Sequence, residues 1–194
     1  MRNKILVTAT GLVVVIAVGA YLLAGGTGKK ESGEADTPGT EAGAPSVEMD
    51  TPGMKQLVHD FSSRSKKAES ASISSTQLIV KDNAQTTTYA LPTDEFFVSI
   101  APYVDKTHPC ATHSLTGCQG EMVEEEFSIT VKDPDGKLVM DNETVKSQPN
   151  GFIDLWLPRD QTYQVTIEQA GKKAESEIST FEANDTCITT MQLG

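Results

Sequence analysis

The stretch EFSITVKDPDGKLVMD, residues 126–141, decides the fold class that this sequence predicts. Residues 126–132 are rich in β-branched and aromatic side chains, as strands are, and residues 137–141 form a second short segment with apolar residues at its centre. Between them, the DPDG of residues 133–136 is typical of a tight turn. The stretch therefore predicts two strands joined by a turn.

The same pattern continues on both sides of this hairpin. Strand-like segments occur at residues 76–80, 86–91, 95–103, 150–158, 161–169, 173–180 and 186–193. Turn residues recur between them at intervals of about ten residues, which is typical of antiparallel all-β domains. We therefore predict a mainly β fold, an antiparallel immunoglobulin-like β-sandwich, over residues 76–194. Trp156 is expected to anchor its core.

The N-terminal part predicts three further segments. Residues 1–24 combine basic residues with a long apolar run, which indicates a signal or membrane-anchor segment and places the rest of the chain outside the cytoplasm. Residues 25–51 are small, polar and acidic and are expected to form a disordered tether. Residues 52–75 are expected to be helical, because Thr51 can cap a helix that begins at Pro52.

The composition narrows the range of partners. The formal net charge is −11, and nucleic-acid binding requires clustered Lys and Arg. We therefore expect no nucleic-acid partner.

Two of the three cysteines, Cys110 and Cys118, lie in one loop together with His108 and His113, whereas Cys187 lies near the C-terminus. A disulfide, a metal site and a redox centre could each account for this loop. A Cys110–Cys118 disulfide would leave Cys187 unpaired, which exported structural proteins normally avoid. Seven residues separate Cys110 from Cys118, more than in a zinc-knuckle pair.

The loop APYVDKTHPCATHSLTGCQGE, residues 101–121, closely resembles the cysteine loop of the CueP family of extracytoplasmic copper-binding proteins. The shared pattern is T-H-x-C-x-x-H-S-L-T-x-C-x-G-E. The resemblance continues in NGFIDLWLPRD, residues 150–160, and in DTCITTMQL, residues 185–193. It covers roughly residues 54–194 and leaves the apolar N-terminus and the tether outside.

The resemblance implies that Cys110, Cys118 and Cys187 are copper ligands. Thiolates are soft ligands that favour Cu(I), in agreement with this assignment. The resemblance also implies thiol-dependent metal reduction, for which Cys110 and Cys118 would be the pair that oxidises. His108 and His113 are candidates either for capturing Cu(II) or for shaping the loop through hydrogen bonds.

These observations predict an extracytoplasmic protein that holds Cu(I) for copper resistance, buffering or hand-over to a copper-requiring enzyme. The resemblance further implies a homodimer formed through the N-terminal part, and residues 1–24 imply contact with a membrane. A thiol-based Cu(II) or Fe(III) reductase and a surface module pinned by a disulfide remain the alternatives. No other catalytic motif is present.

Overall fold

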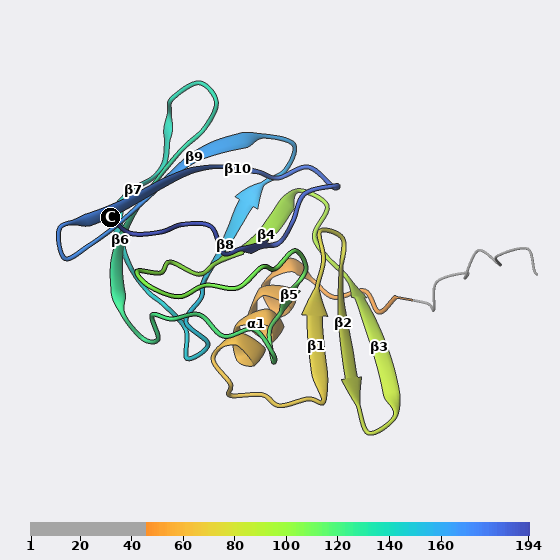
Figure 1. The fold of residues 1–194 in the computed structure, drawn as a ribbon. Coiled ribbons are helices and arrows are strands. Elements are labelled where there is room, and N and C mark those ends of the chain that lie inside the picture. The colour runs from red at the N-terminus through yellow and green to blue at the C-terminus, as the bar shows by residue number, and fades with distance from the viewer. Residues whose placement is uncertain (1–45) are drawn as a thin grey trace, which may run out of the picture. The chain divides into compact units, whose positions relative to one another are not determined.

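The computed structural model describes residues 46–194 (Figure 1). The predicted signal or anchor segment 1–24 and residues 25–45 of the predicted tether lie outside the described residues. The described part is mainly β with antiparallel sheets and one short helix, which confirms the predicted fold class. The elements are α1 (Thr51–Ser62), β1 (Ser70–Ile73), β2 (Gln77–Asp82), β3 (Gln85–Ala90), β4 (Glu95–Ile100), β5 (His113–Ser114), β6 (Glu126–Lys132), β7 (Leu138–Lys146), β8 (Ile153–Pro158), β9 (Thr162–Gln169), β10 (Lys172–Ser179) and β11 (Cys187–Ile188).

Helix α1 begins one residue earlier than the sequence predicts and ends at Ser62. The predicted helical region 52–75 is therefore wrong at its end, where Ser70–Ile73 form strand β1. Asp50 is the N-cap, and its carboxylate accepts a hydrogen bond from the Gly53 N–H at 3.2 Å. Thr51 is therefore already helical, and the prediction that it caps the helix is wrong. The apolar face lies where the spacing placed it, because Met54, Leu57, Val58 and Phe61 are all buried. Among the described residues, no helix is both long enough and apolar enough to cross a membrane.

The first sheet has the strand order β3-β2-β1-β5 and packs against α1. The buried face of the helix contacts apolar side chains of this sheet, such as Ile73 and Leu78. Strands β2 and β3, which the sequence predicts within the sandwich, therefore belong to a separate sheet with a core of its own. This sheet also holds β5, the short strand formed by the middle of the cysteine loop.

The two other sheets, β10-β9-β6-β7 and β11-β4-β8, enclose the larger core. Their inward side chains alternate along the strands, as the burial of Phe127, Ile129 and Val131 on β6 shows. The β6–β7 hairpin closes through the predicted turn, where the Gly136 N–H donates to the Asp133 carbonyl at 2.9 Å. Gly136 has a φ of +81°, a backbone conformation that favours glycine.

Strand β4 is buried on both faces, which explains its largely apolar sequence. Phe96, Val98 and Ile100 point into the sandwich core. Phe97 points to the opposite face, where it joins the core beneath α1 and packs against Trp156 with ring centroids 5.2 Å apart. Trp156 is only partly buried and packs on this second core, so the prediction that it anchors the sandwich core is wrong. Side chains alternate along a strand, so Ser99 shares this second face with Phe97.

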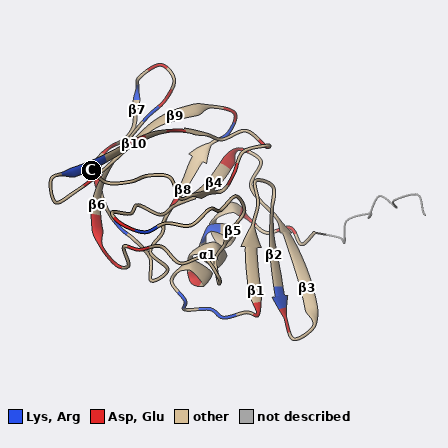
Figure 2. Cartoon of the chain, in the orientation of Figure 1, with Lys and Arg blue, Asp and Glu red and all other residues tan. Residues whose placement is uncertain are grey.

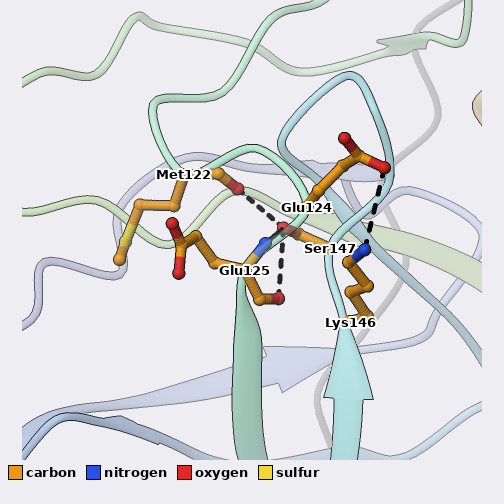
Figure 3. A network of polar contacts seen from close by, with 5 residues as sticks. All are labelled: Met122, Glu124, Glu125, Lys146 and Ser147. Atoms are coloured by element: carbon orange, nitrogen blue, oxygen red, sulfur yellow. Dashed lines mark hydrogen bonds and ion pairs between the residues drawn. The ribbon is translucent and has the colours of Figure 1, made fainter.

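The segment between the cysteine loop and β6 is fastened to the end of β7 (Figure 3). The Ser147 hydroxyl donates to the Met122 carbonyl at 2.7 Å and accepts from the Glu125 N–H at 3.0 Å. Met122 packs against the sandwich core, and Glu124 pairs with Lys146 at 3.7 Å.

Figure 2 shows Lys and Arg on several separate elements, interspersed with Asp and Glu.

Candidate metal centre

The structure brings all three cysteines together, although Cys187 is far from the other two in sequence. Cys110 and Cys187 form a disulfide with their Cα atoms 5.6 Å apart. Cys118 is free, and its sulfur lies 3.6 Å from the sulfur of Cys110. The pairing that the sequence suggested for a disulfide, Cys110 with Cys118, is therefore wrong. Cys110 pairs instead with the cysteine brought close by the last strand.

Cys187 is held in place from both sides of its strand. It begins β11, which runs parallel to β4 and pairs Cys187 with Ser99. On the other side, the backbone N–H groups of Thr186 and Cys187 both donate to the Ala111 carbonyl, at 3.0 and 3.1 Å. The cysteine loop is thus hydrogen-bonded directly to the strand that supplies the third sulfur.

Cys118 is positioned by a tight turn that begins at Ser114. The Cys118 N–H donates to the Ser114 carbonyl at 2.9 Å, and the Ser114 N–H points back at the Cys118 sulfur at 3.4 Å. Two residues further on, the backbone of Gly120 lies against that of Gly151. A Cβ on Gly120 would come within 2.5 Å of the Gly151 carbonyl oxygen. Glycine is therefore needed here for steric reasons, and the contact fixes the end of the loop.

His113 is fully buried at the centre of this arrangement. Its Nδ1 lies 3.5 Å from the Cys187 sulfur, and its Nε2 lies 3.3 Å from the Ser99 hydroxyl. The ring packs on Phe152, with centroids 4.5 Å apart. Burial, assisted by the neighbouring charge of His108, lowers the pKa of His113 to about 3. The imidazole is therefore neutral at neutral pH, the form in which histidine binds metals.

The donor atoms form two groups that share Cys118. One group, His108 with Cys110 and Cys118, is partly exposed, and the other, His113 with Cys118 and Cys187, is largely buried. Within each group the donor atoms lie within 4.8 Å of one another. Sulfur and imidazole donors without carboxylates suit copper or zinc and do not suit calcium or magnesium. The disulfide removes one sulfur from each group, so both are complete only in the reduced protein.

A groove of about 240 Å³ lies beside the partly exposed group. It is lined by Lys106, Thr107, His108, Gln119, Gly120 and Glu121. The Glu121 carboxylate accepts the backbone N–H of Val104 at 2.7 Å and also that of Asp105, which lowers its pKa. These bonds shape one wall of the groove, through which His108 can be reached from solvent.

Ser99 and Asp154 belong to the centre, although nothing in the sequence singles them out. The Ser99 hydroxyl donates to Asp154 Oδ1 at 2.6 Å. Burial raises the pKa of Asp154, and the hydrogen bond from Ser99 opposes that rise. Neither residue stands in the cysteine loop, and no spacing links them to it. Only the register of the strands brings them beside His113.

Comparison with known proteins gives a consistent result. Residues 55–192 match the model of the family described as periplasmic copper-binding protein CueP. The crystal structure of S.CueP is 38% identical, with a TM-score of 0.68, and the match covers 73% of this chain and 88% of that chain. No curated protein matches the chain.

Proposed function

The chain belongs to the CueP family of periplasmic copper-binding proteins, and from this premise we propose that Cys110, Cys118 and Cys187 hold Cu(I). The observation that carries the proposal is the convergence of the three sulfurs, two of them bonded and the third 3.6 Å from Cys110. Reduction of the disulfide leaves three thiols in one place. As thiolates they are the soft ligands that Cu(I) prefers.

The two histidines would serve the same ion in different ways. His113 lies beside Cys187 in the buried donor group and adds a neutral nitrogen ligand. His108 lines the groove and stands in the exposed group, where it would receive copper from solvent. Cys118 belongs to both groups and would remain bound to the ion as it passes from the partly exposed group to the buried group.

The cellular role follows from the compartment. The periplasmic description of the family supports an extracytoplasmic location for this chain. There, a protein that holds Cu(I) would serve copper resistance, buffering or hand-over to a copper-requiring enzyme. Export or anchoring through residues 1–24 and homodimer formation remain predictions.

The test is competition for Cu(I) between the full-length reduced protein and a colorimetric chelator, without oxygen. We expect one Cu(I) per chain, and at least a tenfold weaker affinity in each of the variants Cys110→Ser, Cys118→Ser and Cys187→Ser. His59→Asn is the control, because His59 is exposed on α1 and should leave the affinity unchanged. A reduced protein that does not compete for Cu(I) would favour the alternative, a surface module pinned by its disulfide.

The Cys110–Cys187 disulfide favours a second function, the reduction of Cu(II). Two Cu(II) ions would each take one electron from the thiolate pair, giving two Cu(I) ions and the disulfide, and an added thiol would restore the pair. The pair is then Cys110 with Cys187, in place of the pair expected from the sequence. We expect the reduced protein to yield two Cu(I) per chain, and the variant Cys118→Ser to retain this yield. Loss of the yield in Cys118→Ser alone would contradict this assignment.

A further inference from the structure

Three residues of the central sheet form a row that ends beside His113. Strand β4 pairs Ser99 with Cys187 of β11 on one side and with Asp154 of β8 on the other. Residues directly opposite each other in neighbouring strands point to the same face of a sheet. For this row it is the face away from the sandwich core, because Val98 and Ile100 point into that core.

The row and His113 together form a continuous chain of polar contacts. The Ser99 hydroxyl lies 2.6 Å from Asp154 Oδ1 and 3.3 Å from His113 Nε2. The other ring nitrogen, Nδ1, lies 3.5 Å from the sulfur of Cys187. Ser99 and His113 are completely buried, so water does not compete for these contacts.

The protons in this chain can be assigned. A serine hydroxyl has one hydrogen to donate, and Ser99 donates it to Asp154. While the Asp154 carboxylate is ionised, the Ser99 oxygen can only accept from His113, so Nε2 carries the N–H. A neutral imidazole has a single N–H, which leaves Nδ1 with a free lone pair directed at Cys187.

The ring also has little freedom to turn. The His113 backbone N–H donates to the Thr186 hydroxyl at 3.1 Å, next to Cys187 in sequence. Phe152 packs on the ring at a centroid distance of 4.5 Å, and Phe97 lies at 6.3 Å. Packing fixes the position of the ring, whereas the hydroxyl of Ser99 decides which nitrogen carries the proton.

We propose that Ser99 and Asp154 are positioning residues that hold His113 as the Nε2–H tautomer, so that Nδ1 is ready to bind copper beside Cys187. This inference rests on the proposed function, in which His113 adds a nitrogen to the sulfur site. Partners that orient a metal-binding histidine in this way commonly change metal affinity by 10- to 100-fold.

The first test needs no metal. Two-dimensional ¹⁵N–¹H NMR of the imidazoles in the reduced, metal-free, full-length protein distinguishes a protonated from an unprotonated ring nitrogen. We expect Nε2 of His113 to be protonated and Nδ1 to be unprotonated. Asp154→Ala frees the Ser99 proton and should give a mixture of tautomers. A wild-type protein with Nδ1 protonated overturns the proposal.

The second test measures Cu(I) affinity by chelator competition. Ser99→Ala should weaken binding by at least tenfold, whereas in the His113→Ala background the same change should have no further effect, because Ser99 acts through His113. Thr180→Val is the control, since it removes an equally buried hydroxyl that bonds to the Pro158 carbonyl at 2.9 Å, away from the cysteine loop. We expect its affinity to be unchanged.

The two tests separate this inference from the proposed function. Absence of Cu(I) binding in the wild-type protein, with His113 in the expected tautomer, would defeat the proposed function and leave the proton assignment intact. Wild-type binding with an unchanged affinity in Ser99→Ala would overturn the positioning role alone. Equal losses from Ser99→Ala in both backgrounds would assign Ser99 a structural role, and this too would overturn the proposal.

Discussion

At the scale of single residues, the burial of His113 is the feature of the metal centre that its place in a loop would not predict. Loop histidines are usually solvated, yet this one is completely buried between Phe152 and the sulfur of Cys187. This burial makes the folded state less stable in acid, because a buried imidazole resists protonation. The unfolded chain does not share this resistance.

We therefore expect His113 to make the folded protein less stable in acid. Its pKa is about 3 when folded, against 6.5 when unperturbed, so between these values the unfolded chain binds a proton that the folded protein excludes. Stability should fall as the pH drops below 6.5, by about 2 kcal/mol at pH 5. Urea unfolding of the metal-free protein at pH 7.5 and pH 5 measures this loss.

The variant His113→Asn isolates the effect of this one group. Asp154 acts in the opposite direction, because its raised pKa makes the folded state bind a proton more readily and favours folding as the pH falls. Both proteins retain Asp154, so the difference between their pH dependences belongs mainly to His113. Equal pH dependence in the wild-type protein and in His113→Asn would contradict the prediction.

At the scale of elements, one hydroxyl joins three strands around the centre. Thr186 precedes β11 and is buried. Its hydroxyl donates to the Ile73 carbonyl of β1 at 2.7 Å and accepts from the His113 N–H of β5 at 3.1 Å. Strands β5 and β11 are only two residues long, so single contacts of this kind largely determine where His113 and Cys187 lie.

Replacing this hydroxyl should disturb both stability and copper binding. Thr186→Val keeps the volume but leaves two buried backbone groups without partners, which costs about 1–3 kcal/mol. We expect that loss in urea unfolding, together with at least a fivefold weaker Cu(I) affinity in the chelator assay.

Thr180→Val is the matched control for this change. Thr180 is equally buried, and its hydroxyl bonds to the Pro158 carbonyl at 2.9 Å, within the sandwich and away from the cysteine loop. It should lose comparable stability without loss of Cu(I) affinity. If both variants lost affinity in parallel, the effect of Thr186 would be one of general stability.

At the scale of the whole described part, the centre lies where two cores meet. The sheet of β11, β4 and β8 faces the sandwich core on one side and the core beneath α1 on the other. The cysteine loop contributes β5 to the first sheet and bonds to β11 of the central sheet. The Cys110–Cys187 disulfide therefore fastens two sheets together and closes a loop of 77 residues.

Reduction of the disulfide should loosen this connection, and Cu(I) should restore it. A crosslink that closes a loop this long typically stabilises a protein by about 2–4 kcal/mol, so the reduced metal-free protein should unfold at a lower temperature. One Cu(I) per chain bridging the same sulfurs should raise the unfolding temperature again, because ligands that bind only the folded state stabilise it. Circular dichroism melting with and without reductant, and with Cu(I), measures both effects.

The cysteine variants provide the controls at this scale. The double variant Cys110→Ser/Cys118→Ser retains Cys187 alone and cannot form a disulfide within the chain, so reductant should not change its unfolding temperature. Cys118→Ser keeps the disulfide and should respond to reductant as the wild-type protein does. A wild-type protein that is equally stable with and without reductant would mean that the crosslink adds nothing to the packing of the two sheets.

The sequence by itself determined the fold class, the buried face of α1 and the composition of the cysteine loop. These follow from patterns within short segments, such as the alternation along residues 126–132 and the turn at residues 133–136. The family, too, could be identified from the loop, because many positions of one continuous pattern match. Local patterns of this kind are set by backbone geometry and side-chain burial, which neighbouring residues largely control.

The tertiary structure decided which groups meet. It separated β2 and β3 from the sandwich, paired Cys110 with Cys187, and buried His113 beside a serine and an aspartate that no motif distinguishes. Ser99 reaches the centre because β4 pairs with β11 and β8 in one register, and a shift of one residue would turn it to the opposite face. Register between strands distant in sequence depends on how the two cores pack, so no single segment could reveal it.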